Sequence, residues 1–293
     1  MKAAAFTYAR PTSVVNALEL LAAHGDRAKV LSGGQSLMPA MNLRLMSPDL
    51  VVDIGGLAEL RGITIRRDAL IIGALTRHVE LLRSPEVAEH APLLREAVTH
   101  VAHPAIRNRG TIGGSLAHAD PASELPACTV ALDAAVVVRG PDGERRIAAR
   151  EFFKGIYETA LSANELLVAI EIPLAGEGSR FFFQEYARRH GDYAIIGLAA
   201  HAVVKDGRFA ALQLAFFAVE DRPLLVEAAR KLINVSVTPA SLDEASAALD
   251  DELDPQQDQQ ATPAMRRHLA KVLLRHCVAT LLARPELETG AAG

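Results

Sequence analysis

The sequence predicts an α+β protein with more than one domain, and three observations lead to this prediction. The chain has 293 residues, which corresponds to about two domains at roughly 150 residues each. Half of the residues are hydrophobic, enough to bury more than one core. Helical and strand-like patterns alternate near the N-terminus, whereas later strand-like runs are joined by hairpin turns, as in antiparallel sheets.

The first predicted unit covers residues 1–58 and has a small α/β pattern. Ser13 precedes an amphipathic stretch and Gly25 follows it, which predicts a capped helix of about three turns. Two strands and one helical turn are expected in the rest of this unit, at residues 29–31, 50–54 and 37–41. A glycine turn follows the first of these strands.

The second predicted unit covers residues 59–177 and is a larger, antiparallel subdomain. Its strands are expected at residues 63–66, 70–73, 134–139, 145–149 and 165–172. Its helices are expected at residues 76–82, 92–101 and 123–132, with a glycine-containing loop at 107–115. Glycines at 176–179 predict the boundary to the next domain.

Residues 178–293 predict a C-terminal domain with a three-stranded antiparallel sheet and helices. The strands are expected at 181–187, 196–205 and 209–219, and the helices at 222–233, 239–249 and 263–282. The last helix is expected to bury a face with Met265, Leu269, Val272, Leu273 and His276. The acidic stretch 250–258 predicts a solvated linker, and the tail after Arg284 is expected to fray.

Composition argues against several classes of function. Lys plus Arg number 31 and Asp plus Glu 35, so the net charge is −4 and no basic run offers a surface for nucleic acid. Two cysteines, Cys128 and Cys277, cannot form a disulfide scaffold, a structural zinc site or an iron–sulfur cluster, and are expected to be reduced and buried. The apolar run 194–204 is shorter than the roughly 20 residues of a membrane span. We expect a cytoplasmic protein without a membrane span or a nucleic-acid partner.

Two glycine doublets have hydroxyl residues on both sides. The first run is Ser32, Gly33, Gly34, Gln35 and Ser36, and the second is Thr111, Ile112, Gly113, Gly114 and Ser115. Glycines let backbone amides approach a phosphate and hydroxyls add donors, so two such loops facing each other predict a diphosphate site. Tight turns that need positive φ are the structural alternative. Neither run matches the P-loop or the dinucleotide-binding glycine motif, which argues against nucleoside triphosphate hydrolysis.

Three other groups of residues each have a structural and a functional interpretation. One histidine cluster has no carboxylate or cysteine at ligand spacing, so no metal site is predicted at His100, His103 and His118. Asp120 or Ser123 caps a helix, or a carboxylate in this segment accepts hydrogen bonds from a chain of hydroxyl groups. Tyr193 belongs to a polar turn or lies over a flat ring.

Five segments, in this order, carry a resemblance to a known family. They are Leu31-Ser-Gly-Gly-Gln-Ser-Leu37-Met-Pro, Ile106-Arg-Asn-Arg-Gly-Thr-Ile-Gly-Gly114-Ser, Asp120-Pro-Ala-Ser-Glu-Leu-Pro126, Leu166-Leu-Val-Ala-Ile-Glu-Ile-Pro173 and Arg188-Arg-His-Gly-Asp-Tyr193. Together they resemble the FAD-binding medium subunit of molybdenum hydroxylases, the family of carbon monoxide dehydrogenase and xanthine dehydrogenase. The resemblance spans nearly the whole chain.

The resemblance implies a vanillyl-alcohol-oxidase (PCMH)-type FAD-binding fold of two subdomains, with a C-terminal domain that covers the flavin. The two glycine runs would hold the diphosphate and adjacent sugar atoms. Hydroxyl groups of the ribityl or ribose would be bound by Glu124, His118 and Asp120, adenine by Leu167, and the flavin ring by Tyr193. The residues implied in FAD binding are therefore Leu31, Ser32, Gly33, Gly34, Gln35, Ser36, Leu37, Thr111, Ile112, Gly113, Gly114, Ser115, His118, Asp120, Glu124, Leu167 and Tyr193.

The resemblance also implies a role in electron transfer within a complex. A large subunit would hold the molybdenum cofactor and hydroxylate the substrate, and a small subunit with two [2Fe–2S] clusters would pass electrons to FAD on this chain. The chain would give them to an external acceptor, with no catalytic residue for substrate turnover and no metal of its own, in a dimer of heterotrimers. The alternatives are a self-contained FAD-dependent oxidase and a nucleotide-binding module without a redox role.

Some positions depart from the pattern of the resembled family. Ser115 stands where relatives often carry Asn, and Gln184 and Glu185 are neutral and acidic near a position where relatives often carry Lys. The flavin potential and the electron acceptor therefore stay open. Arg107 and Arg109 support the loop, dock a partner or are solvated. If the two glycine runs bind the diphosphate, Gly34→Val or Gly113→Val is expected to abolish FAD retention and to leave the fold largely intact.

Overall fold

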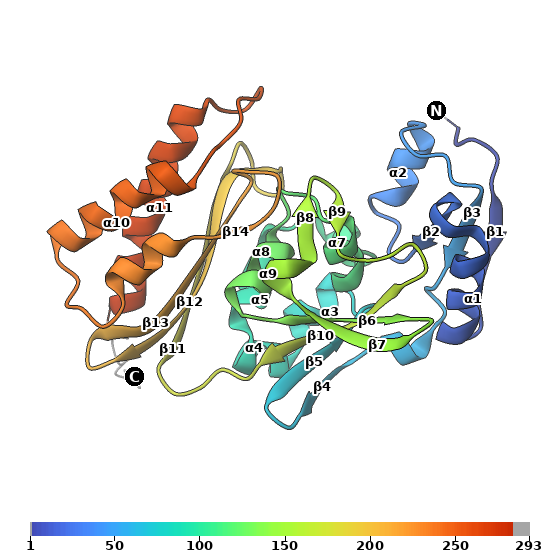
Figure 1. Ribbon diagram of the computed structural model, residues 1–293, viewed down its shortest axis with the longest axis horizontal. Coiled ribbons are helices and arrows are strands. Elements are labelled where there is room, and N and C mark those ends of the chain that lie inside the picture. Colours follow the sequence, from blue (N-terminus) through green and yellow to red (C-terminus); the bar gives the residue numbers. More distant parts are fainter. Residues whose placement is uncertain (1, 284–293) are drawn as a thin grey trace, which may run out of the picture.

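The computed structural model describes residues 2–283, and the expectation for the tail after Arg284 concerns residues outside this range. Three main sheets follow one another along the chain (Figure 1). The first is parallel with the order β1-β3-β2, and its strands are β1 (Thr7–Ala9), β2 (Ala28–Leu31) and β3 (Leu50–Asp53). Helices α1 (Val14–His24) and α2 (Leu37–Asn42) connect these strands. The Ser13 hydroxyl accepts a hydrogen bond from the Asn16 amide, so the predicted cap of α1 is confirmed.

The second sheet is antiparallel and has the order β4-β5-β10-β6-β7. Its strands are β4 (Ile63–Arg66), β5 (Ala69–Gly73), β6 (Ala135–Gly140), β7 (Gly143–Ala148) and β10 (Leu166–Pro173). These agree with the predicted strands. A short helix and a two-stranded ribbon follow β7, formed by α9 (Ala149–Phe152), β8 (Phe153–Gly155) and β9 (Glu158–Thr159).

Six helices lie between β5 and β6. They are α3 (His78–Arg83), α4 (Pro85–His90), α5 (Pro92–His100), α6 (Pro104–Arg107), α7 (Ile112–His118) and α8 (Glu124–Ala131). The short helices α4 and α6 are additions to the prediction. Helix α7 begins inside the segment 107–115, which was predicted to be a loop throughout. This prediction was wrong for its last four residues and for Arg107, which ends α6. Thr111 caps α7, so the glycines that suggested a loop form the first turn of a helix.

The third sheet is antiparallel and has the order β11-β12-β13-β14. Its strands are β11 (Ser179–Ala187), β12 (Ala194–Lys205), β13 (Arg208–Phe217) and β14 (Leu224–Leu225). The prediction of three strands was wrong because β14 pairs with β13 through two residues only, too few for a pattern. The helix predicted at 222–233 is replaced by β14 and the 3₁₀ helix η3 (Glu227–Leu232).

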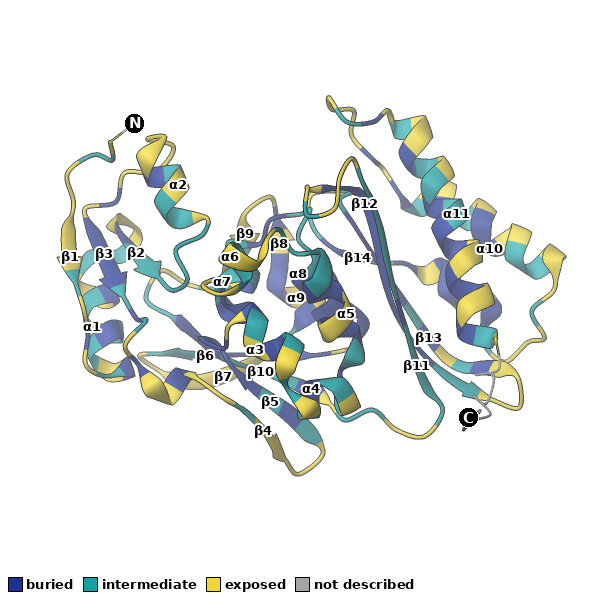
Figure 2. Cartoon of the chain, turned by 180° about the vertical axis from the view of Figure 1, so that it is seen from behind, coloured by how far each residue is buried: buried dark blue, intermediate teal, exposed yellow. Residues whose placement is uncertain are grey.

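Helices cover both faces of the third sheet. Helices α10 (Pro239–Glu252) and α11 (Pro263–Leu282) lie on its outer face, and α5 and α8 lie between its inner face and the second sheet (Figures 1 and 2). The inner face contributes Ala199, Ala215 and Phe217 to the same buried core as α5 and α8. The C-terminal sheet is therefore joined to the rest of the chain by a continuous apolar core.

The buried face of α11 differs from the predicted one. Met265 is 47% exposed, and the buried residues are Arg266, Ala270, Leu273, Leu274, Cys277, Val278 and Leu281. Arg266 can be buried because its guanidinium donates to the carbonyl oxygens of Ile195 and Gln256 and to the carboxylate of Asp258. The prediction of a solvated linker at 250–258 was thus wrong in part, since this segment supplies partners to a buried cation and its start belongs to α10.

Both cysteines are free and buried, as predicted. Burial raises the pKa of the Cys128 and Cys277 thiols well above the ordinary value, which keeps both of them protonated. Among residues 2–283 no helix combines the length and the apolar character that crossing a membrane requires.

Candidate functional site

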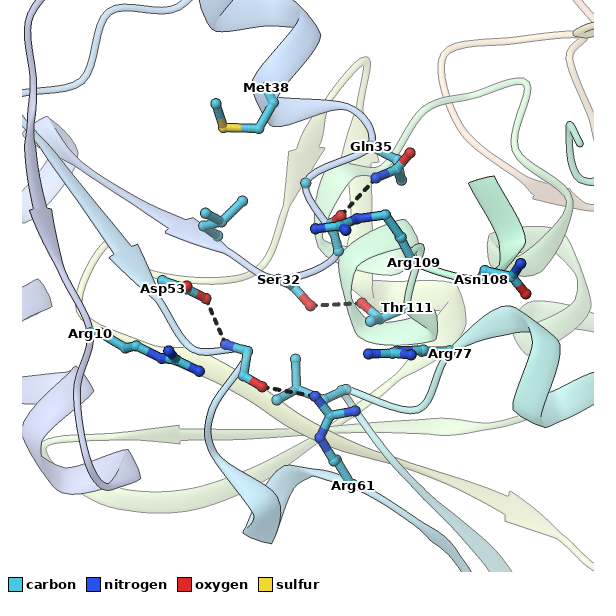
Figure 3. A pocket seen from close by; sticks show the side chains of 15 residues that line it. Arg10, Ser32, Gln35, Met38, Asp53, Arg61, Arg77, Asn108, Arg109 and Thr111 are labelled. Atoms are coloured by element: carbon cyan, nitrogen blue, oxygen red, sulfur yellow. Dashed lines mark hydrogen bonds between the residues drawn. The ribbon is translucent and has the colours of Figure 1, made fainter. Parts of the chain in front are cut away.

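The two glycine runs meet where the first and second sheets adjoin. The first run follows β2 and the second opens α7, and the Ser32 Oγ lies 2.7 Å from the Thr111 Oγ1 (Figure 3). Thr111 also accepts a hydrogen bond of 3.1 Å from the Gly114 amide, which fixes the start of α7. Residues 79 positions apart in the sequence are thereby held in hydroxyl contact.

Glycine is required where these segments approach each other. A Cβ on Gly33 would lie 2.4 Å from the carbonyl oxygen of Arg109 in the other segment, whereas one on Gly114 would lie 2.8 Å from the Thr111 Oγ1 of its own run. Gly113 has a different role, because a Cβ there would lie 2.6 Å from the Cβ of Ala74 in the adjoining core. The expectation that Gly113→Val leaves the fold largely intact was therefore wrong.

The two runs differ in the backbone amides that they offer. In the second run the amides of Ile112, Gly113 and Ser115 donate to the carbonyl oxygens of Thr76, Ala74 and Thr111. In the first run no hydrogen bond within the described part of the chain uses the amides of residues 33–36. The first loop therefore offers free donors to an anion, whereas the second offers chiefly its hydroxyl groups.

A cavity of about 490 Å³ opens beside this contact (Figure 3). Six residues of the predicted set line it: Leu31, Ser32, Gly33, Gly34, Gln35 and Thr111. Sequence reasoning missed most of the other lining residues. They are Arg10, Met38, Asp53, Gly55, Arg61, Leu75, Arg77, Asn108 and Arg109. Four arginines against one aspartate make the lining cationic, which suits a phosphate-bearing ligand. Among these residues, Met38, Asn108 and Arg109 lie in the segments that carry the resemblance, and Asp53 lies at the end of a parallel strand.

The remaining residues of the two runs lie next to this cavity without lining it. They are Ser36, Leu37, Ile112, Gly113, Gly114 and Ser115, and Ile112 is fully buried. The two arginines of the second segment have different surroundings. Arg107 donates to the carbonyl oxygens of Val101 and Ala102, which supports the loop after α5, whereas Arg109 lines the cavity.

A second group of predicted residues gathers at the other end of α7. His118 is the last residue of this helix, and its ring stacks on that of Tyr157 at a centroid distance of 4.8 Å. Burial and the charge of Asp120 raise the pKa of Tyr157, and the same two causes raise the pKa of Tyr193. His118, Asp120 and Tyr193 thus surround one region, and Tyr157 is a member that no sequence signal indicated.

Glu124 belongs to this second group. It is the first residue of α8, and burial raises its pKa to about 8. The charge of Glu124 also contributes to the raised pKa of Tyr193. Leu167 lies in β10 at an irregularity of the pairing with β6, is 4% exposed and does not line the cavity.

Neighbouring residues of β11 point in opposite directions. The Gln184 side chain accepts a hydrogen bond of 2.6 Å from the His276 ring on α11, on the outer face of the sheet. The Glu185 side chain points inward, with its Oε1 3.4 Å from the Nδ1 of His100 on α5. This alternation, with period two, is that of a strand covered on both faces.

The donor set fits a long ligand with an anionic part and a hydroxyl-rich part. Free amides and arginines lie at one end of α7, and carboxyl groups and aromatic rings lie at its other end. Seven helical residues at about 1.5 Å each separate these ends by about 10 Å. A dinucleotide with a central diphosphate has this distribution of groups.

Comparisons with known proteins agree with this geometry. Residues 4–175 match the family described as FAD binding domain in molybdopterin dehydrogenase, and residues 181–281 match the CO dehydrogenase flavoprotein C-terminal domain. The chain is 46% identical over 200 residues to the 6-hydroxypseudooxynicotine dehydrogenase complex subunit alpha of Paenarthrobacter nicotinovorans, which covers 68% of each chain. It is 35% identical to the carbon monoxide dehydrogenase medium chain of Afipia carboxidovorans, over 95% of this chain and 97% of that one.

A solved structure gives the same result for the fold. The carbon monoxide dehydrogenase of Hydrogenophaga pseudoflava contains a chain that superposes with a TM-score of 0.94 at 34% identity, covering 97% of this chain and all of that one. The PCMH-type FAD-binding fold predicted from the resemblance is therefore confirmed. The chain belongs to the FAD-binding medium subunits of the molybdenum hydroxylase family, of the carbon monoxide dehydrogenase type.

Proposed function

We propose that the chain binds FAD in extended form along α7 and carries electrons between a partner subunit and an external acceptor. The observation that supports this most is the group of unused amides at residues 33–36, beside the Ser32–Thr111 contact and a cationic cavity. FAD, when bound, supplies a carrier that accepts and releases electrons singly or in pairs. The residues of this chain bind it, orient it and limit the access of water.

In this proposal the diphosphate and neighbouring sugar atoms lie against the two runs, with the first loop as the source of backbone donors. The hydroxyl groups of the second run contribute through Thr111 and Ser115. Glu124, Asp120 and His118 bind hydroxyl groups toward the other end, where Tyr193 packs near the flavin ring. Leu167 contacts the adenine. Arg77 and Arg109 add positive charge beside the diphosphate, which the sequence alone did not indicate.

We propose that the electrons come from two [2Fe–2S] clusters in a small subunit, and that a large subunit with the molybdenum cofactor hydroxylates the substrate. The two cysteines of this chain are both buried in its own cores, so cluster ligands have to come from another chain. Several relatives are named as subunits of larger dehydrogenases, which supports the same division. We further propose a dimer of heterotrimers in the cytoplasm, where free thiols are typical.

The proposal can be tested on the complex purified from its native host. The expected visible spectrum has flavin bands together with broad iron–sulfur absorbance, and two further polypeptides accompany the chain. The mass of the complex shows whether two three-subunit units associate. The double variant Ser32→Ala, Thr111→Ala is expected to lose flavin absorbance and to keep the iron–sulfur absorbance.

Other spectra would contradict the proposal. Flavin alone, bleached by a substrate without partner chains, would identify a self-contained oxidase. A colourless protein that does not take up added FAD would contradict the family-based expectation, and phosphate-dependent stabilisation of that protein would identify a nucleotide-binding module without a redox role.

A further inference from the structure

The turn that carries Tyr193 joins β11 to β12, whose pairing ends at Ala187 and Ala194. Tyr193 is 65% exposed, so its own packing does not fix its ring. At the start of the turn, Arg188 donates a hydrogen bond of 2.8 Å to the carbonyl oxygen of Gln259. The position of the Tyr193 ring therefore depends on the contacts that the rest of the turn makes with its surroundings.

Two of these contacts place the turn on the end of α5. The His190 ring lies 5.6 Å from the His100 ring between centroids, and the two rings are steeply inclined. Gly191 lies directly against the chain after α5, because a Cβ there would be 2.7 Å from the Ala102 carbonyl oxygen. That oxygen accepts a hydrogen bond of 3.0 Å from Arg107, which fixes it. The end of α5 thus supports the turn.

A buried carboxyl group lies behind this support. The Glu185 side chain is 3% exposed, and its Oε1 lies 3.4 Å from the His100 Nδ1. Its Oε2 is buried and has no hydrogen-bond partner within residues 2–283. A carboxylate in such surroundings is costly without a cation beside it, and the hydrogen bond with Glu185 raises the pKa of His100. The ion pair, together with the Phe183 ring at 5.0 Å, holds the His100 ring in one orientation.

Charged and titratable groups face His100 from every element packed around it. They are Glu96 on α5, Glu185 on β11, His190 on the turn, Glu124 on α8 and Arg107 on α6. Arg107 donates to the carbonyl oxygens of the residues on either side of His100. The Glu96 carboxylate lies 4.0 Å from the His100 ring and its side chain is 61% exposed. Of the two carboxyl groups in contact with the ring, Glu185 is the nearer and the more buried.

We propose that Glu185 and His100 are positioning residues of the flavin site, whose ion pair supports the turn 188–193 and thereby keeps the Tyr193 ring against the flavin. The proposal rests on the proposed function, in which Tyr193 packs near the flavin ring. Glu185 and His100 act through the turn, and His190 carries the contact between them. An aromatic ring held against a flat ligand ring contributes about two- to tenfold in affinity beyond its buried area.

The test measures flavin fluorescence on the full chain loaded with FAD, and the dissociation constant of FAD on the chain after removal of its flavin, from about pH 6 to about pH 9. Fluorescence reports on Tyr193, because a tyrosine ring in contact with a flavin quenches its emission. In the wild type the emission is expected to be quenched at the acid end. Quenching is expected to be lost as the pH rises through the pKa of His100, which lies above its ordinary 6.5, because His100 then loses its charge.

Three variants locate this effect. Glu185→Gln is expected to give brighter flavin and about two- to tenfold weaker FAD binding at neutral pH, and to move the break to lower pH, since it removes the largest cause of the raised His100 pKa. Glu96→Gln is the matched control and is expected to move the break less, because this carboxylate is exposed. His190→Ala removes the ring contact and leaves the ion pair in place. It is expected to reproduce the brighter flavin and the weaker binding.

The double variant Glu185→Gln, His190→Ala is expected to match His190→Ala alone, since both changes act through one contact. Effects that add in the double variant, or wild-type fluorescence that is constant over this pH range, would overturn the proposal and leave FAD binding standing. His190 is exposed, so His190→Ala tests the turn even if Glu185→Gln does not fold, and unchanged quenching in it would also overturn the proposal. A wild-type chain that binds no FAD at any pH would instead overturn the proposed function.

Discussion

Thr111 takes part in three contacts that have different purposes. Its hydroxyl caps α7 through the Gly114 amide and faces the Ser32 hydroxyl from the first sheet, while its carbonyl oxygen accepts from the Ser115 amide. One side chain thus determines both where the helix begins and how the two glycine runs face each other. Replacing Thr111 is therefore expected to affect both the start of α7 and the contact between the two runs.

Replacing this hydroxyl gives a prediction with a conservative control. Thr111→Ala is expected to lower the free energy of unfolding by about 1 kcal/mol, the usual cost of losing such a cap, and to weaken FAD binding. Thr111→Ser keeps the hydroxyl and is expected to stay close to the wild type in both. Urea unfolding and FAD titration measure the two quantities. Equal FAD affinity for both variants would show that the Thr111 hydroxyl does not contribute to FAD binding.

Gly33 allows the first loop to lie against the backbone of Arg109. Gly33→Val is expected to separate the two loops, since its Cβ would lie 2.4 Å from a carbonyl oxygen that cannot rotate away. The expected cost in unfolding free energy is about 1–3 kcal/mol, together with loss of bound flavin. Gly176→Val, where no atom lies within 4 Å of the added Cβ, is the control. A yellow, fully stable Gly33→Val protein would show that the loops tolerate a wider separation.

Among the elements, α11 shows how one buried cation attaches a helix to a loop. Arg266 is 5% exposed and reaches Ile195 in β12 as well as Gln256 and Asp258 in the segment before the helix. The guanidinium thereby connects the C-terminal sheet, the loop and the helix. Removing it would take away the donor to the carbonyl oxygens of Ile195 and Gln256.

Arg266→Met keeps most of the apolar volume and removes these donors, so it is expected to destabilise the chain by about 2–3 kcal/mol.

The interaction between Arg266 and Asp258 also predicts that stability depends on pH. The hydrogen bonds that Asp258 accepts from Arg266 and from backbone amides hold the pKa of Asp258 below its usual 3.8 despite partial burial. A carboxyl group whose pKa is lower in the folded chain than in the unfolded chain stabilises the fold at pH values above the unfolded pKa. This stabilisation is lost as the pH falls through the folded pKa.

Urea unfolding at a series of pH values from neutral to below 3.8 measures this effect. The wild type is expected to lose stability at the acid end by more than Asp258→Asn does, because the variant has no carboxyl group to protonate. Identical acid profiles would mean that the pair with Arg266 contributes nothing to folding.

At the scale of the whole molecule, the sequence predicted much of the architecture because the signals were local. Hairpin turns and strand patterns located the second sheet, and glycines between hydroxyl residues located both loops. The two-residue strand β14 is too short for any pattern, and α7 was taken for a loop because glycine is a poor helix former. The face of α11 was misjudged because a buried arginine interrupts its apolar pattern.

The site was predicted less completely than the fold. The resemblance supplied residues at both ends of α7, but of the four arginines that line the cavity only Arg109 lies in a segment that carries it. Arg10, Arg61 and Arg77 belong to no motif. Glu185 contacts His100, which lies 85 positions earlier and meets it only when the third sheet packs on α5. Contacts between sheets determine which side chains are charged and which hydrogen-bond donors are free, and no single segment of the sequence contains that information.

The shared core predicts how the chain responds to cleavage. The segment between β10 and β11 is irregular, whereas Phe217 and its neighbours on the third sheet pack into the core of α5 and α8. A protease that cuts within residues 174–178 is expected to give two fragments that elute together from a size-exclusion column. Separation is expected only in denaturant. Fragments that part in native buffer would show that the third sheet is held weakly.

The short length of α7 has a consequence for ligand selection. Because this helix is rigid and about 10 Å long, a molecule must be long enough to touch the groups at both of its ends at once. FMN carries the flavin, the ribityl chain and one phosphate, so it reaches both ends of the helix, but it lacks the second phosphate and the adenosine. We expect FMN to bind at least a hundredfold more weakly than FAD in a competition titration, since losing the second phosphate and the adenosine removes several hydrogen bonds at about 1 kcal/mol each. Comparable affinities would mean that the groups spanning α7 select the cofactor by themselves, and that the second phosphate and the adenosine add nothing to binding.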